Sequence, residues 1–360
     1  MLIALGVIIK EFASESDHFN IEKFAKLSTL EIIGNIGLVM IVLEAALDLK
    51  LEKDKMKLIL NSFLVALIAL VASSGAIATI IYYAIPGADD FVSCLVYAVP
   101  LSIMSSAIII PSVGGLTGVK KEFMVYESTF SDILGIMVFY FLIESEHSNG
   151  AAEIVTSIGI NILVTIIASI VLAYLMVFIF QRLTSQVKLF LVISLLMFVF
   201  ALGKKMHLSS LLIILAFGLV LNNSEIFFKG RLSKYFNKEK TKPIMHDFHI
   251  LTLESAFVIR TFFFVLFGMF ITLKSIIDLN VALVSVGIIA SLYLVRYLTL
   301  KIIVKQDITP QLYIAPRGLI TILLFFVIGA HPSFVIKDFD AGILFFVIFI
   351  SSTIMTIVFF

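Results

Sequence analysis

Two carboxylates and two serine hydroxyls lie within six residues of an otherwise apolar stretch, 124–143. Asp132 is about eight residues into this stretch, roughly 12 Å along a helix. Ser128 and Ser131 add hydroxyl oxygens, hard ligands that suit a small monovalent cation. A desolvated carboxylate can take either a proton or a cation near neutral pH. We therefore predict that a proton and a cation compete for Asp132. The alternative is a structural aspartate hydrogen-bonded to a neighbouring helix.

The second acid of this segment, Glu127, is expected to have a different role. It precedes Asp132 by five residues, which places it about 140° further around a helix. A buried carboxylate that faces protein needs a fixed cation, and a guanidinium stays charged. We predict Arg296 as its partner, with Arg260 as the alternative, so that Glu127 is neutralised and does not exchange ions. The competing interpretation is that Glu127 itself binds the transported species.

Two apolar stretches are interrupted by proline or glycine. Stretch 91–113 has prolines on both sides of Ser105 and Ser106, and stretch 309–330 contains the sequence Pro-Arg-Gly around Arg317. Proline removes a backbone donor, so both stretches are predicted to unwind within the membrane. Paired interruptions of this kind indicate the binding site of an inverted-repeat transporter. We expect Ser105 and Ser106 among the ion ligands and Arg317 as the charge that balances the second interruption.

Two further acids are less informative. Glu44 ends the stretch 31–50 beside a lysine-rich segment, where it is either an interfacial acid or part of the ion path. Glu254 and Arg260 are six residues apart, about 240° around a helix, so they are not expected to pair with each other. Their partners are left open.

The elements that must position these residues are membrane helices. Hydrophobic residues make up 61% of the 360 positions, against roughly 45–50% in soluble domains. No segment alternates apolar and polar residues with the period of two that a β-barrel requires. Cys94 is the single cysteine, which excludes an intrachain disulfide and a CxxC metal site. We predict an all-α polytopic membrane protein. Its apolar stretches are 1–10, 31–50, 57–85, 91–113, 124–143, 151–180, 187–203, 207–222, 246–272, 279–304, 309–330 and 341–360.

Basic residues predict the orientation of the chain in the membrane. Of the 26 Lys and Arg residues, 16 fall in one alternate set of connections, which includes 223–245, and 7 in the other. Because basic residues favour the cytoplasmic side, the chain is expected to end in the cytoplasm. The first stretch is too short to span a bilayer, and we expect it to be the tail of a helix whose start is missing.

Several motifs resemble the monovalent cation/proton antiporter family of the sodium/proton exchanger type. Segment 127–132 is similar to the Glu-Ser-x-x-Asn-Asp signature, with Ser131 in place of asparagine. Segment 316–318 is similar to the Arg-Gly signature of the second broken helix. Segments 43–47 and 262–268 resemble the family's Phe-Glu-Gly-Gly-Leu and Phe-Phe-x-x-x-Gly stretches. The likeness covers nearly the whole chain.

The resemblance implies an inverted-repeat antiporter fold with two broken crossing helices, about 12 helices being present of an expected 13. It implies an ion-binding core at 57–145 and 279–360, a dimerisation domain at 1–50 and 187–272, and a linking helix at 151–180. The ion-binding aspartate would be Asp132, the buried pair Glu127 and Arg296, and the auxiliary acid Glu44. The implied protein is a homodimer of the cell membrane that exchanges Na⁺ for H⁺ by alternating access and serves pH homeostasis.

Two departures from the family pattern bear on the ion. Ser105-Ser106-Ala107 stands where many sodium/proton exchangers have Thr-Asp-Pro, and it is closer to the potassium-efflux branch. With one titrating carboxylate we predict one cation per proton and no net charge moved. The alternatives are exchange or efflux of K⁺, symport of sodium with an organic anion, and a non-transporting scaffold. No catalytic constellation, cofactor motif or nucleic-acid signature is present, so we expect neither an enzyme nor a cofactor.

Overall fold

A computed structural model describes residues 2–14, 28–51, 53–116, 118–144, 188–205, 210–228, 238–270, 278–305 and 307–359, with scattered positions between 164 and 175. These residues are helical apart from their connections. The chain divides into two compact units. The first unit comprises Met1–Glu31, Asp54–Ile143 and Arg260–Phe360, and the second comprises Ile32–Lys53 and Glu144–Ile259.

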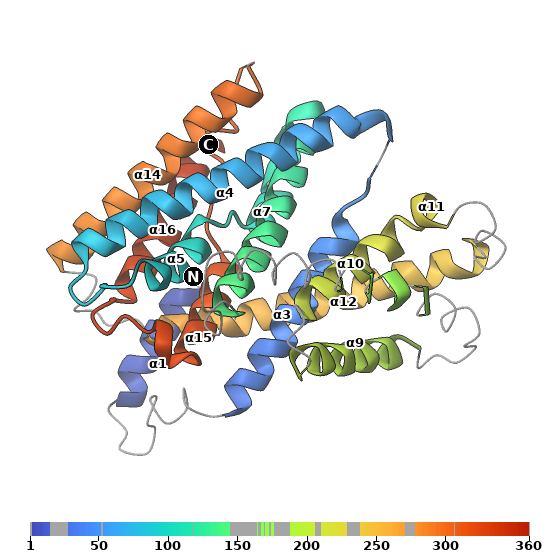
Figure 1. Cartoon of the computed structure of the whole chain (residues 1–360), viewed down its shortest axis with the longest axis horizontal. Coiled ribbons are helices and arrows are strands. Elements are labelled where there is room, and N and C mark those ends of the chain that lie inside the picture. The colour runs from blue at the N-terminus through green and yellow to red at the C-terminus, as the bar shows by residue number, and fades with distance from the viewer. Residues whose placement is uncertain are drawn as a thin grey trace. The chain divides into compact units, whose positions relative to one another are not determined.

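The first unit contains most of the long helices (Figure 1). The start of α5 is set by Asp90, whose side chain accepts hydrogen bonds from the backbone N–H groups of Val92 and Ser93. Asp278 caps α14 in the same way. The helices are α1 (Leu2–Ser14), α4 (Met56–Ala84), α5 (Phe91–Ser102), α6 (Ser106–Ser112), α7 (Gly118–Glu144), the end of α12 (Lys238–Phe270), α14 (Leu279–Ile303), α15 (Leu319–Gly329) and α16 (Gly342–Phe359).

The second unit is built from shorter described helices. It holds most of α3 (Ser28–Asp48), together with α9 (Lys188–Lys205), α10 (Ser210–Asn222), α11 (Ser224–Phe227) and the first part of α12. Asn223, at the turn between α10 and α11, accepts a hydrogen bond from Leu51 N–H and donates to the Leu49 carbonyl. This amide ties the end of α3 to α10. The predicted linking helix 151–180 lies outside the described residues except for the scattered positions.

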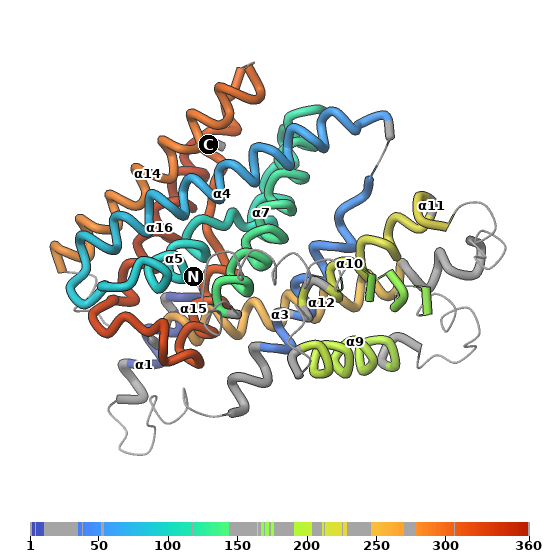
Figure 2. Tube along the Cα trace, viewed as in Figure 1, coloured from blue at the N-terminus to red at the C-terminus, as the bar shows by residue number. Residues whose placement is uncertain are grey.

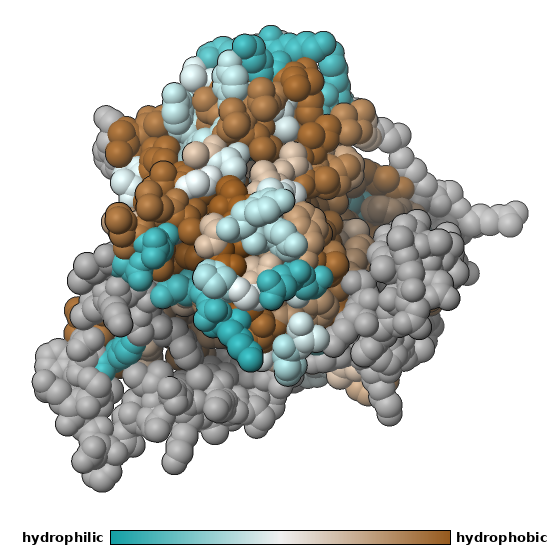
Figure 3. Space-filling model, turned by 60° about the vertical axis from the view of Figure 1, so that its left-hand side comes forward, coloured by the Kyte–Doolittle hydropathy of each residue, from teal (hydrophilic) through white to brown (hydrophobic). Residues whose placement is uncertain are grey.

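The helices identify a multi-pass membrane protein. Among the described residues, five segments are long and apolar enough to cross a membrane: Met56–Ala84, Phe91–Gly115, Gly118–Ile143, His246–Met269 and Leu279–Ile303. In the first unit, α4 packs along α14 and α5 packs against α4 and α15 (Figure 2). The side of α4 and α14 presents a broad hydrophobic surface with hydrophilic residues gathered at its edge (Figure 3). Ile68, Val71, Leu283 and Leu294 are among its exposed apolar side chains.

The interrupted stretches differ from each other. The first is broken cleanly at residues 103–105, between α5 and α6. In the second, residues 309–313 form hydrogen-bonded turns rather than an α-helix, and residues 314–318 have no regular secondary structure before α15 begins. Pro310 and Pro316 account for this because each removes an N–H that an α-helix would use. Two other boundaries also move: α7 begins at Gly118 and α12 at Lys238, both earlier than the apolar stretches suggested.

Candidate functional site

The break between α5 and α6 redirects three consecutive backbone N–H groups. In an uninterrupted helix, the N–H groups of residues 104, 105 and 106 would bond to the carbonyls four residues earlier. Here all three are donated to other parts of the first unit, so the break is held by tertiary contacts. The acceptors are Ser131 Oγ for Met104 at 3.0 Å, the Pro316 carbonyl for Ser105 at 2.9 Å, and Asp132 Oδ2 for Ser106 at 3.1 Å.

The second interruption lies directly against the first. The bond from Ser105 N–H to the Pro316 carbonyl joins the two interrupted segments. Gly318 allows this approach, because a Cβ atom added there would lie 2.3 Å from Ser105 Oγ. Arg317 N–H, in turn, donates to Ser351 Oγ on α16 at 3.1 Å. The two breaks therefore form one crossing.

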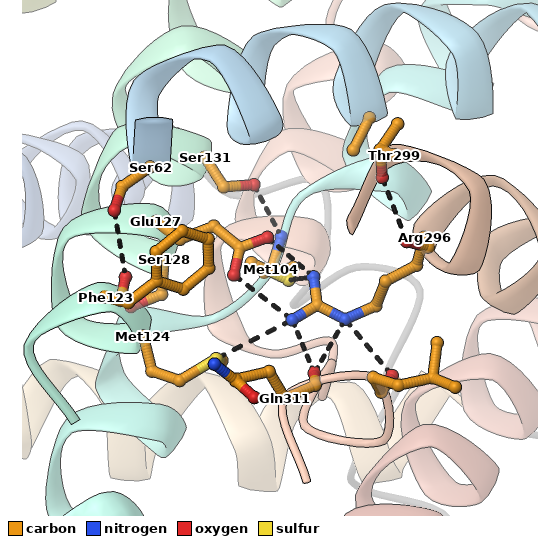
Figure 4. A network of polar contacts seen from close by, with 12 residues as sticks. Ser62, Met104, Phe123, Met124, Glu127, Ser128, Ser131, Arg296, Thr299 and Gln311 are labelled. Carbon is orange, nitrogen blue, oxygen red and sulfur yellow. Dashed lines mark hydrogen bonds and ion pairs between the residues drawn. The ribbon is translucent and has the colours of Figure 1, made fainter. Parts of the chain in front are cut away.

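Asp132 lies on α7 at this crossing. Its side chain is buried, at 1% exposure, and accepts the N–H of Ser106. Ser128, one turn earlier and also buried, donates its hydroxyl proton to the Val125 carbonyl, so its oxygen can present lone pairs to a ligand. Ser131 Oγ accepts a hydrogen bond from the N–H of Met104 (Figure 4). The predicted hydroxyls and the aspartate thus come from α7 and from the break before α6.

Glu127 faces α14 and is bound by Arg296 (Figure 4). Arg296 Nη1 lies 2.7 Å from Glu127 Oε1, and Nη2 lies 3.1 Å from Oε2, so the ion pair is bidentate. The glutamate side chain is fully buried and that of the arginine is 4% exposed. The structure brings these two residues together, whereas Arg260, the alternative partner, lies on α12.

Arg296 also holds the segment that precedes the second interruption. Its Nε donates to the carbonyls of Gln311 and Leu312 at 3.0 and 3.2 Å, and Nη2 donates to the Gln311 carbonyl at 2.7 Å. The thioether sulfurs of Met104 and Met124 complete its surroundings, at 3.0 and 3.7 Å from guanidinium nitrogens. One guanidinium thus links α7, α14, the first break and the turns before the second.

Arg317 is the other buried arginine of the crossing. Its exposure is 4%, and its Nε and Nη1 have no hydrogen-bond partner among the described residues. Its guanidinium interacts electrostatically with Tyr293, Arg296 and Glu127. Four charged side chains are buried among the described residues, Glu127, Asp132, Arg296 and Arg317, and all four belong to the first unit.

Glu44, the acid for which an auxiliary role was predicted, lies on α3 in the second unit and is partly exposed. One turn later, Asp48 Oδ1 is 2.8 Å from His249 Nε2 on α12. Sequence reasoning did not foresee this pair, because its members are 201 residues apart and no local pattern connects them. Glu254, also on α12, is exposed.

The comparisons with known proteins decide the family. The family described as "Sodium/hydrogen exchanger, transmembrane" matches residues 1–360. The chain belongs to this family. This is a family of cation/proton antiporters, so the chain belongs to a family of transporters.

Solved structures agree in fold. The sodium proton antiporter MjNhaP1 from Methanocaldococcus jannaschii, in a structure at pH 8, matches with a TM-score of 0.74 and 19% identity, over 99% of this chain and 88% of that one. A second structure of MjNhaP1, described as an electron-microscopy map, matches with a TM-score of 0.65 and 20% identity, over 99% and 87% of the two chains. No curated protein matches in sequence. The antiporter fold expected from the sequence is therefore confirmed.

Proposed function

We propose that this sodium/hydrogen exchanger family member exchanges one Na⁺ for one H⁺, and that Asp132 is the group that binds each in turn. The observation that carries the proposal is the position of Asp132, buried at the crossing of the two interruptions with Ser106 N–H as a donor. Both oxygens of Glu127 are bound by Arg296, which supports Asp132 rather than Glu127 as the exchanging group.

The buried charges support electroneutral exchange. With Asp132 ionised, the charges of Glu127, Asp132, Arg296 and Arg317 sum to zero. Binding either a proton or a monovalent cation at Asp132 raises that sum by one. Because both loaded forms carry the same charge, one-for-one exchange moves no net charge across the membrane. Arg317 supplies the second positive charge of this sum.

Oxygen ligands for the cation come from the same crossing. The hydroxyls of Ser105, Ser106, Ser128 and Ser131 are all buried near the redirected backbone. Hydroxyl and carboxylate oxygens suit Na⁺ or Li⁺ and also K⁺. The family favours Na⁺, and the alternative of K⁺ exchange is decided by the measurement below.

The movement that alternates access is proposed from the family likeness. The core at 57–145 and 279–360 would carry the site, and a dimerisation domain at 1–50 and 187–272 would contribute Glu44 to the ion path. The homodimer, the location in the cell membrane and the cytoplasmic C-terminus belong to the same proposal, the last supported by the distribution of basic residues.

The test is proton movement in vesicles that contain the purified protein and hold a pH gradient. Addition of Na⁺, Li⁺ or K⁺ to the unmodified protein names the ion. Asp132→Asn should abolish the response, because a neutral amide neither releases a proton nor attracts a cation. Asp89→Asn is the matched control, since Asp89 is exposed in the loop before α5. It should respond like the unmodified protein.

Two results would count against the proposal. A response retained by Asp132→Asn would remove Asp132 from the exchange. A rate that changes when the membrane potential is clamped at different values with a potassium ionophore would contradict electroneutrality, because a neutral cycle carries no charge through the field.

A further inference from the structure

The break between α5 and α6 separates the donor and the acceptor of one helical hydrogen bond, so each needs a new partner. In a continuous helix Met104 N–H would bond to the Pro100 carbonyl. Met104 N–H instead bonds to Ser131 Oγ on α7 at 3.0 Å. The Pro100 carbonyl consequently needs another donor, because a buried carbonyl without a partner is costly.

Thr321 supplies that donor. Its Oγ1 lies 2.8 Å from the Pro100 carbonyl, and the bond is buried, with Thr321 at 1% exposure. Thr321 is on the first turn of α15, directly after the second interruption. Two side chains from different helices, Ser131 and Thr321, therefore take over the two halves of the broken bond.

We infer that Thr321 is a positioning residue for the Asp132 site, an inference that rests on the function proposed above. Without its hydroxyl, the Pro100 carbonyl is satisfied most simply by the return of Met104 N–H. That movement would wind the break by one residue and draw the following N–H groups with it. Ser106 N–H would then leave Asp132, so Thr321 acts on the site through the Pro100 carbonyl.

The consequence is a change in competition at the site. A hydrogen bond to a carboxylate favours its charged form, which is the form that binds a cation. Loss of the Ser106 donor therefore helps the proton to compete, while Glu127, Arg296 and Arg317 keep their charges. The expected effect of Thr321→Val is a rise of about tenfold in the KM for the cation at neutral pH, the scale of one hydrogen bond to a charged group. The pH profile of transport should move to higher pH, with kcat little changed.

The experiment compares three variants in the vesicle assay. Thr321→Val has nearly the same shape without the hydroxyl, and Thr321→Ser restores the hydroxyl and should restore both KM and pH profile. Thr353→Val is the control, because Thr353 is exposed on α16 and its hydroxyl donates to the Phe349 carbonyl of its own helix. A purely structural role for Thr321 would lower the amount of active protein at every pH and leave KM and the profile in place, and that result would overturn the inference.

A second measurement does not depend on transport. Hydrogen exchange of peptides that cover residues 103–109 should be faster in Thr321→Val than in Thr353→Val, because Ser105 and Ser106 lose their acceptors. Unchanged exchange would refute the positioning role even if the protein transports ions. If hydrogen exchange is faster in Thr321→Val but the unmodified protein moves no cation, the proposed function alone is refuted and the positioning role stands. If Thr321→Val does not fold, Thr321→Ala is measured in its place, and failure of both to fold would make Thr321 structural and overturn the inference.

Discussion

The ion pair between Glu127 and Arg296 should dominate the stability of the crossing. Glu127→Gln keeps the size of the side chain and one acceptor for Nη1, but its amide nitrogen faces the second guanidinium donor, which now lies 3.1 Å from the position of Oε2. Removal of one partner from a buried pair costs about 3–5 kcal/mol. Arg296 keeps its bonds to the carbonyls of Gln311 and Leu312, so we expect a loss near the lower end, about 3 kcal/mol.

Thermal unfolding of the purified protein in lipid nanodiscs measures this loss. With about 2 °C per kcal/mol for a chain of this size, the midpoint should fall by roughly 6 °C. Glu122→Gln is the matched control on the same helix. Glu122 pairs with Lys55 at 2.8 Å, but these side chains are 40% and 32% exposed, and a surface pair of this kind contributes about 0–1 kcal/mol.

A double variant separates the charge from the packing. Glu127→Leu with Arg296→Met replaces both charges by apolar groups, and it should be less destabilising than the sum of the two single changes. Recovery should be partial, because the Gln311 and Leu312 carbonyls lose their donor. If Glu127→Gln lowers the midpoint no more than Glu122→Gln does, the pair does not hold the crossing and the reasoning is wrong.

Two further outcomes are expected. Gly318→Ala should destabilise the crossing by about 1–3 kcal/mol and slow transport, because its Cβ would meet Ser105; Gly287→Ala, where nothing lies within 4 Å of the added atom, should be silent in both measurements. Asp307 accepts hydrogen bonds from Lys120 Nζ and from the hydroxyl and N–H of Thr309, and these hold its pKa below the ordinary value. The stabilisation by ionised Asp307 should therefore be complete above about pH 4, the ordinary pKa of aspartate, and be lost only as the pH falls further. The unfolding midpoints of the unmodified protein and of Asp307→Asn should accordingly differ at pH 6 and converge in acid. A difference that grows in acid, or an inactive Gly287→Ala, would contradict these expectations.

The sequence alone was sufficient for the class of protein and the family. An apolar stretch of membrane length forms a helix whatever its neighbours are, because a helix satisfies its own backbone hydrogen bonds wherever it packs. Such helices can therefore be predicted from the segment alone. Proline has a similarly local effect, so the breaks near Ser105 and Arg317 could be located in advance. The interruption of the second stretch, predicted from its prolines, extends over residues 309–318, where turns at 309–313 precede the start of α15.

Only the tertiary structure could decide which groups meet across the breaks. The sequence reduced the partner of Glu127 to two arginines, and the fold selected Arg296, 169 residues away. Nothing in the sequence around Thr321 relates it to the Pro100 carbonyl, 221 residues earlier, or relates Asp48 to His249. Hydrophobicity and proline sterics are properties of one segment, whereas the acceptor found by a freed N–H group depends on which helices pack together and in what register. The sequence determined where the chain would break, and the packing of α7, α14 and α15 decided what holds the break open around Asp132.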